Sequence, residues 1–422
     1  MKIADAVERL SVEAPPAVRF TAYDGSSYGP DGAPVTMHLA TERGLSFLAT
    51  APGDLGLARA YVSGDLELQG VHPGDPYEAL KALKQWRFRR PTAVEAVDLL
   101  REFGLRRLVP PPPPPQETLP RWRRTTEGLR HSRRRDAEAI GKHYDVSNAF
   151  YEKVLGPSMA YTCAVFPKPD ASLEEAQEEK FDLVARKLGL EPGMRLLDVG
   201  CGWGGMARHA ATHYGVNVVG VTLSRQQASW AAETMAREGL SERVKILHLD
   251  YRDAPGEGYD AISSIGLLEH VGVRNYPSYF RFLHDKLRDG GRLLNHCITR
   301  PDNASDPKTG AFIDRYVFPD GELTGSGRIV TTAQDAGLEV RHSENLREHY
   351  ALTLKAWCAN LVQHWDECVA DVGEATAKVW GLYMAGSRLG FETNGVQLHQ
   401  VLAVKVTADG QASFPLRPTW FR

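Results

Sequence analysis

The sequence has little cysteine, no long apolar run and no large net charge. Its five cysteines are scattered over 422 residues without a Cys-x-x-Cys pair, which argues against a disulfide scaffold or a zinc knuckle and for a reducing compartment. No apolar stretch reaches the ~18–20 residues that span a bilayer, and the charged start of the chain lacks the apolar core of a signal peptide. The net charge of −3 gives no global attraction to polyanions. These absences predict a cytoplasmic protein without a bound metal.

The composition is that of a soluble globular protein, with 42% hydrophobic and 24% charged residues. Residues 1–109 predict a small α+β domain, with strands at 18–23, 35–40 and 45–49 and helical periodicity at 57–66 and 76–109. Six consecutive prolines at 110–115 open a Pro-rich and basic linker over 110–136, because such a run is a stiff, extended spacer. A ligand for a proline-recognition domain is the alternative interpretation of this run.

Basic residues gather near aromatic ones at 86–90 and 121–124, and again at 130–135. Such clusters suit an anionic membrane surface, because each basic residue contributes about 1 kcal/mol to the free energy of binding to it. A nucleic-acid surface and an ordinary solvated face are the two alternatives. The membrane interpretation predicts a protein that associates peripherally with the inner face of the membrane and has no nucleic-acid partner.

Strands and helices alternate beyond residue 136. Strands are predicted at 194–199, 216–221, 243–248, 259–264, 291–298 and 397–406, and helices at 171–188, 203–214, 224–239 and 276–287. Residues 344–404 add a helical insertion. This alternation predicts an α/β fold with a doubly wound, Rossmann-like sheet, so residues 137–422 are expected to form the catalytic domain.

A glycine-rich loop, Asp198-Val-Gly-Cys-Gly-Trp-Gly-Gly205, follows the first of these strands and precedes a helix. Glycines allow backbone N–H groups to approach a ligand closely at the positive end of a helix. The loop satisfies the spacing of a dinucleotide site, so its pattern alone does not exclude NAD. Asp198 favours S-adenosylmethionine instead, because a carboxylate attracts a sulfonium cation and repels a pyrophosphate.

The end of the second strand carries no acid that could hold a ribose. Thr222, Ser224 and Gln227 are the polar side chains available there. This departs from the fingerprints of both kinds of cofactor site.

Three strings together resemble the cyclopropane-fatty-acyl-phospholipid synthases and mycolic-acid methyltransferases: residues 159–166, the loop at 198–205, and residues 266–272. Further strings that match this family, in the expected order, are residues 143–148, 221–224, 250–253, 294–298 and 316–321. The resemblance covers about residues 140–405, and the first domain resembles the additional domain of the phospholipid-acting members.

The resemblance implies that S-adenosylmethionine donates a methyl group to a cis-unsaturated acyl chain of a membrane phospholipid. A bicarbonate ion then acts as the base that allows a cyclopropane ring to close. The residues that would hold this ion are Cys163, Glu269, His296, Ile298 (through its backbone) and Tyr350. The cofactor contacts carried over by position are Tyr161, Gly200, Gly202, Thr222, Leu223, Ser224, Gln227, Tyr251 and Arg252, with Asp198 organising the loop.

Three other functions remain open at this point. The same methyl transfer can yield a methylene or methyl-branched chain in place of a ring. A methyltransferase of RNA or of a small metabolite would use the basic stretch for its substrate. A lipid-binding protein without activity is the third, although all five residues expected around the bicarbonate are of the expected type. A homodimer is the assembly that we expect.

Overall fold

The computed structural model describes residues 1–15, 17–118 and 147–420. Contacts divide the chain into two compact units. The first unit contains Met1–Leu119, Gly310–Pro319 and Leu354–Leu389, and the second contains Pro120–Thr309, Asp320–Thr353 and Gly390–Arg422. Two segments from the second half of the chain therefore pack with the N-terminal residues, whereas the sequence placed both segments in a domain over 137–422.

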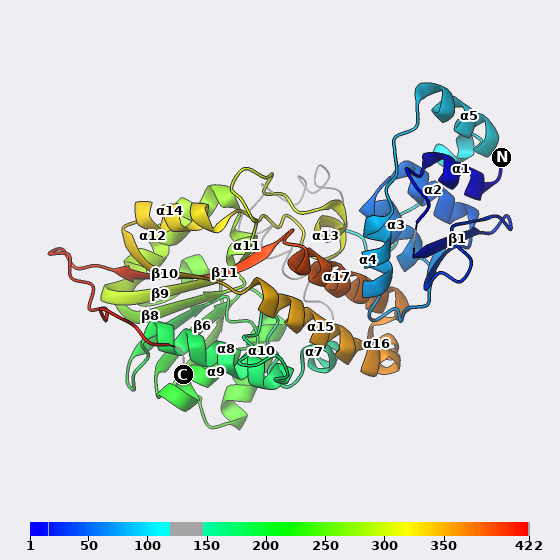
Figure 1. The fold of residues 1–422 in the computed structure, drawn as a ribbon. Coiled ribbons are helices and arrows are strands. Elements are labelled where there is room, and N and C mark those ends of the chain that lie inside the picture. The colour runs from blue at the N-terminus through cyan, green and yellow to red at the C-terminus, as the bar shows by residue number, and fades with distance from the viewer. Residues whose placement is uncertain (16, 119–146, 421–422) are drawn as a thin grey trace. The chain divides into compact units, whose positions relative to one another are not determined.

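The second unit is built around a seven-stranded sheet, which confirms the predicted doubly wound α/β fold (Figure 1). Its strand order is β10-β11-β9-β8-β5-β6-β7. Strands β5 to β9 are parallel, and β10 and β11 are antiparallel additions. The strands are β5 (Arg195–Val199), β6 (Asn217–Thr222), β7 (Val244–His248), β8 (Tyr259–Ile265), β9 (Leu287–Thr299), β10 (Leu338–Asn345) and β11 (Gln397–Lys405).

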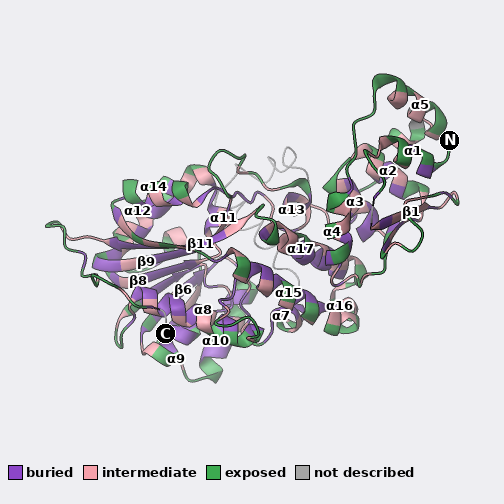
Figure 2. Ribbon diagram, viewed as in Figure 1, coloured by how far each residue is buried: buried purple, intermediate pink, exposed green. Residues whose placement is uncertain are grey.

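Helices cover both faces of this sheet, as Figure 1 shows. One face carries α8 (Leu173–Leu188), α9 (Gly205–Tyr214) and α10 (Arg225–Arg237), and the other carries α12 (Tyr276–Lys286) and α14 (Ser326–Asp335). The central strands β5, β8, β9 and β11 are mostly buried (Figure 2), whereas the edge strands β7 and β10 are partly exposed. This is why β5 reads as an almost uninterrupted apolar run rather than an alternating one.

Strand order reverses next to β5. The chain runs from β5 to β6 and β7 on one side, then returns to β8 on the other side of β5. In sheets of this kind, ligands bind outside the carboxyl ends of the strands at such a point. Short helices follow these strands: η3 (Tyr251–Asp253) after β7, and α11 (Leu268–Val271) and η4 (Val273–Asn275) after β8.

The helix α8 begins where the sequence predicted, with a capping box. The Ser172 hydroxyl accepts a hydrogen bond from the Glu175 N–H, and the Glu175 carboxylate accepts one from the Ser172 N–H. Gly189 ends the helix in a left-handed conformation. Residues 173, 177, 180, 184 and 187 lie at helical spacing on its buried side.

The first unit contains a four-stranded sheet in the order β2-β1-β3-β4. The strands are β1 (Val18–Ala22), β2 (Ser27–Tyr28), β3 (Val35–Leu39) and β4 (Leu66–Gln69). The helices of the N-terminal part are α1 (Ile3–Leu10), α2 (Glu42–Thr50), α3 (Asp54–Val62), α4 (Tyr77–Gln85), α5 (Ala93–Phe103) and η1 (Leu105–Leu108). The later segments add α13 (Ala311–Tyr316), α16 (Trp365–Val372), and parts of α15 (Arg347–Gln363) and α17 (Glu374–Glu392).

The predicted strand at 45–49 is wrong, because these residues lie in helix α2. The Thr41 side chain accepts a hydrogen bond from the Gly44 N–H and caps this helix. A short apolar run does not distinguish a strand from a buried helical turn. The sequence analysis also did not predict β10 or α14.

Trp86 does not belong to an exposed basic and aromatic surface, contrary to the interpretation of residues 86–90. It is buried in the core of the first unit, and its indole N–H donates to the Ser11 hydroxyl at 3.0 Å. Phe88 is 53% exposed, and Arg89 is paired with Glu95. The predicted basic clusters at 121–124 and 130–135 lie outside the described residues.

All five cysteines are buried and none is in a disulfide. In the part of the chain that the structure describes, no helix is long and apolar enough to cross a membrane. The same residues contain no cluster of three or more side chains that could hold a metal ion.

Candidate active site

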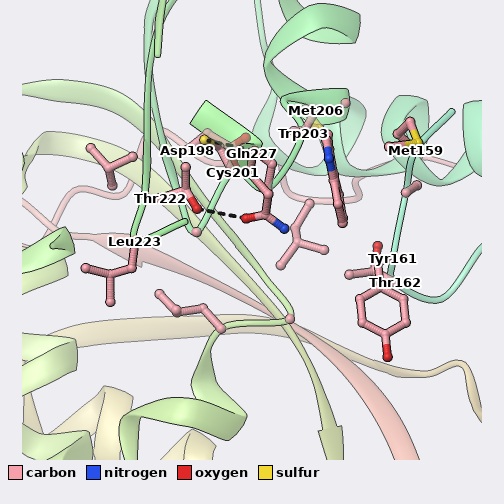
Figure 3. Close-up of a pocket in the computed structure, with 18 of the residues that line it drawn as sticks. Met159, Tyr161, Thr162, Asp198, Cys201, Trp203, Met206, Thr222, Leu223 and Gln227 are labelled. Carbon is pink, nitrogen blue, oxygen red and sulfur yellow. Dashed lines mark hydrogen bonds between the residues drawn. The ribbon is translucent and has the colours of Figure 1, made fainter. Parts of the chain in front are cut away.

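A pocket lies at the carboxyl ends of β5, β6 and β8, where the strand order reverses (Figure 3). Its lining comes from residues 159–162, helix α8, the glycine-rich loop and the segments that follow β6, β7 and β8. Eight of the residues expected to contact the cofactor line it: Tyr161, Asp198, Gly200, Gly202, Thr222, Leu223, Gln227 and Tyr251.

The glycine-rich loop is held close to the sheet. The N–H groups of Gly200 and Cys201 both donate to the Val221 carbonyl, at 2.9 and 3.0 Å. Gly200 has a φ of +75°, and a Cβ at this position would lie 3.2 Å from the Cβ of Leu267. A larger residue would be strained there and would narrow the pocket. The loop therefore presents bare backbone to a ligand.

Asp198 closes the base of the pocket at the end of β5. It is buried, and its Oδ1 accepts a hydrogen bond from the Ser263 hydroxyl at 2.7 Å. Burial raises the pKa of this carboxyl to about 6, against the lowering effect of that hydrogen bond and of the Lys180 ammonium. Its Oδ2 has no hydrogen-bond partner among the described residues, so it can accept a hydrogen bond from a ligand.

Thr222 and Gln227 form one polar unit on the wall of the pocket. The Thr222 hydroxyl donates to Oε1 of Gln227 at 2.9 Å (Figure 3). This fixes the orientation of the Gln227 amide and leaves its NH₂ group as a donor. Ser224 does not line the pocket, and its hydroxyl instead caps α10 by accepting from the Gln227 N–H at 3.3 Å.

Tyr251 and Arg252 have different positions. Tyr251 lines the pocket, and its ring packs edge-on against the Tyr279 ring at 5.2 Å. Arg252 does not line the pocket: its guanidinium donates to both carboxylate oxygens of Asp250, at 2.7 and 2.5 Å. Arg252 thus stabilises the loop that carries Tyr251.

Lys180 lines the pocket and was missed in the sequence. It is 1% exposed, its Nζ donates to the Thr162 hydroxyl at 3.0 Å, and it lies 3.8 Å from the centre of the Phe181 ring. Burial lowers its pKa to about 7, although Cys163 and Asp198 oppose that shift. The signal was present, because Lys180 falls on the apolar stripe of a helix, where a lysine is rarely buried without a partner.

A second group of polar side chains lies at the ends of β8 and β9. Oε1 of Glu269 accepts a hydrogen bond from the Ile298 N–H at 2.7 Å, while its Oε2 has no partner in the described part of the chain. Burial raises the pKa of Glu269 to about 7, against the lowering effect of this hydrogen bond. His296, two residues before Ile298, is 1% exposed, and its Nε2 also has no partner among those residues.

The other two residues expected around the bicarbonate are connected to this group through Leu346. The Cys163 thiol donates to the Ala164 carbonyl at 3.1 Å and lies 3.8 Å from the Leu346 carbonyl, which also accepts from the Tyr350 N–H. The Leu346 N–H in turn donates to the Leu398 carbonyl, and Leu398 pairs with Ile298 between β11 and β9.

The five residues come from four separate segments, and the hydrogen bonds join Glu269 to Ile298 on one side and Cys163 and Tyr350 to Leu346 on the other. None of the five lines the cofactor pocket itself. Burial raises the pKa of Cys163, which keeps it a neutral thiol.

Comparison with known proteins gives a consistent result. Residues 131–401 match the family described as mycolic acid cyclopropane synthetase. A probable fatty acid methyltransferase of Mycobacterium tuberculosis is 60% identical over 421 residues, which cover 100% of this chain and 98% of that protein.

Two solved structures are also similar: a cyclopropane synthase of Mycobacterium tuberculosis, and a mycolic acid cyclopropane synthase complexed with SAH and CTAB. Each has a TM-score of 0.60 and 33% identity, and the match covers 63% of this chain and 97% of the other.

The buried Glu269 predicts a stability difference that depends on pH. Its pKa rises from 4.5 to about 7 on folding, so the folded state holds the proton more tightly than the unfolded state. This proton contributes about 3 kcal/mol to the free energy of unfolding. The contribution is fully present below pH 4.5 and is lost as the pH rises through 7. Glu269→Gln has no such proton to lose, so it should gain stability relative to the native protein across this range.

Urea unfolding of both proteins at several pH values measures this difference. The same substitution at the exposed Glu8 is the control. A difference between native protein and Glu269→Gln that stays constant with pH would contradict the assignment.

Proposed function

Because the chain belongs to the mycolic acid cyclopropane synthetase family, we propose that it forms a cyclopropane ring on the cis double bond of a fatty acyl chain of a membrane phospholipid. Membership of the family makes it an S-adenosylmethionine-dependent methyltransferase that acts on lipid chains. The observation that carries the finer proposal is the pair of buried, unsatisfied atoms Glu269 Oε2 and His296 Nε2. A methyltransferase without a bound base has no need to leave them unpaired.

The pocket at the end of β5 fits S-adenosylmethionine, which supplies an electrophilic methyl group. The bare backbone at Gly200 and Gly202 is available to the amino-acid portion of this cofactor. The Asp198 carboxylate provides the negative charge that favours a cationic ligand, and the Gln227 NH₂ provides a directed donor.

Aromatic and apolar contacts complete the proposed cofactor site. Tyr161, Leu223 and Tyr251 line the same pocket and can pack on the nucleoside. Ser224 and Arg252 act indirectly, the first by capping α10 and the second by holding Asp250.

The second group of side chains fits a bicarbonate ion, which supplies a base that accepts a proton from the new methyl group. Glu269 Oε2 can accept a hydrogen bond from the OH of such an ion once its carboxyl is ionised, and His296 can donate to one of its oxygens. Cys163, Tyr350 and the Ile298 backbone are the proposed neighbours. Cys163, His296 and Tyr350 are buried, which suits this chemistry because a carbocation formed on the acyl chain must be kept from water.

A methylene or methyl-branched product is the second candidate. The relative that is 60% identical over its whole length is named as a probable fatty acid methyltransferase rather than as a cyclopropane synthase. The same pocket and the same base serve the methylene outcome, in which a hydride shifts to the cationic carbon before the methyl proton is lost. A saturated methyl branch requires a further reduction by a separate hydride donor.

Product analysis tests the proposal. The purified protein is incubated with S-adenosylmethionine and vesicles of an unsaturated phospholipid, and the fatty esters are examined by mass spectrometry before and after mild hydrogenation. We expect a product that is heavier by one CH₂ group and does not take up hydrogen. A product that takes up hydrogen under mild conditions is a methylene compound and would refute ring formation, and activity on RNA or a small metabolite without vesicles would refute the lipid substrate.

Glu269→Gln is the matched variant in this assay. Loss of the carboxylate should reduce turnover by roughly 10²–10⁴-fold, the usual contribution of acid–base catalysis. The affinity for S-adenosylmethionine, measured by calorimetry, should stay unchanged because Glu269 does not line the cofactor pocket. Unchanged turnover would refute its role.

We also propose that the protein binds peripherally to the inner, anionic face of the membrane. Phe88 is exposed next to the exposed Arg87, and Arg90 extends the stretch, whereas the Arg89 charge is paired with Glu95. We expect co-sedimentation with anionic but not with zwitterionic vesicles, weakened by salt because the attraction is screened. Phe88→Ser should bind anionic vesicles more weakly than the native protein at the same salt concentration, because it removes an exposed apolar contact. Binding that depends on neither anionic lipid nor salt would contradict the proposal.

A further inference from the structure

A chain of polar side chains runs across one face of the sheet, from Lys187 to His296. The Lys187 ammonium, on α8, donates to the Glu344 carboxylate on β10 and to Oε1 of Gln400 on β11, the latter at 2.7 Å. The Gln400 Nε2 lies 3.2 Å from Nδ1 of His296 on β9. Lys187, Gln400 and His296 are all at most 1% exposed, so water does not compete for these contacts.

The chemistry of these groups fixes the direction of each hydrogen bond. An ammonium group has only donors, so the oxygen of the Gln400 amide must face Lys187. The NH₂ of that amide then faces His296, and Nδ1 must be the acceptor. Burial and the Lys180 and Lys187 charges hold the pKa of His296 well below its usual range, so the ring is neutral and carries one proton. That proton is on Nε2.

We infer that Lys187 and Gln400 are positioning residues that hold His296 in its Nε2–H tautomer, and so make the unpaired Nε2 a hydrogen-bond donor to an oxyanion. The opposite tautomer would present a lone pair to the same space and would repel an anion. The inference rests on the proposed function only for the identity of that oxyanion. The tautomer itself follows from the contacts.

A purely structural role accounts less well for this arrangement. Burying the lysine charge has a high desolvation free energy, and an apolar side chain in the same place would not have this penalty. The single Glu344 carboxylate would also be enough to pair the Lys187 charge. The additional contact satisfies the buried oxygen of the Gln400 amide and, by doing so, fixes which end of the amide faces His296.

The tautomer can be measured by long-range ¹H–¹⁵N correlation on the full-length protein labelled with ¹⁵N-histidine. The His296 signal is assigned by its loss in His296→Asn. We expect a pyrrole-type shift for Nε2 and a pyridine-type shift for Nδ1. A native protein with the proton on Nδ1 overturns the inference.

Gln400→Glu is the main variant, because a carboxylate can keep the contact with Lys187 but can only accept from His296. The proton should move to Nδ1, and kcat should fall by roughly 10–100-fold, the range seen when residues that orient a metal-binding histidine are replaced. The affinity for S-adenosylmethionine should not change. Gln397→Glu is the control: Gln397 lies on the same strand, and its amide bonds Asn394 at 2.7 Å rather than His296.

A second pair of variants keeps the test decisive if Gln400→Glu does not fold. Lys187→Gln retains a donor to Oε1 of Gln400 and should keep the Nε2–H tautomer, whereas Lys187→Met removes the donor and should give both tautomers. A tautomer that is unchanged in Gln400→Glu or in Lys187→Met overturns the inference. If the tautomers behave as expected but no lipid product forms, the proposed function fails while the inference stands.

Discussion

Buried polar groups that must be hydrogen bonded away from water organise this site. Helix α8 carries three of them on its buried side: Gln177, Lys180 and Lys187. Gln177 donates to the carbonyls of Ala160 and Thr162, Lys180 donates to the Thr162 hydroxyl, and Lys187 donates to Gln400. An unmade bond of this kind costs about 1–3 kcal/mol. The helix therefore fixes both the segment that carries Tyr161 and Cys163 and the strand that orients His296.

Two of the buried atoms without a partner belong to side chains that are expected around the bicarbonate. Glu269 Oε2 and His296 Nε2 are buried without partners among the described residues, although Oε1 of the same glutamate and Nδ1 of the same histidine are both bonded. In each side chain one polar atom orients the group and the other is left for a ligand. Stability is given up at such positions for function. A raised pKa at Glu269 and a depressed one at His296 follow from the same burial.

Local sequence patterns predicted strands β5 to β9 and helices α8 to α10 of the second unit because their signals are strong, but they did not predict β10 or α14. The capping box of α8 and the glycine-rich loop after β5 are local, and the structure contains both. The strand assigned to 45–49 failed because a short run with four apolar residues fits a helix equally well. Trp86 was misread because its partner, Ser11, is far away in the sequence. Lys187 and Gln400 could not be paired in advance, since 213 positions separate them and only the order of strands brings them together.

The dependence of turnover on bicarbonate tests the central claim most directly, namely that His296 and Glu269, which the Ile298 N–H orients, hold an oxyanion that acts as the base. Turnover with unsaturated phospholipid vesicles is measured in buffer freed of carbon dioxide, with and without added bicarbonate, at constant pH. The account predicts low turnover without bicarbonate and a saturable recovery when it is added. Turnover that is the same in both buffers would contradict it.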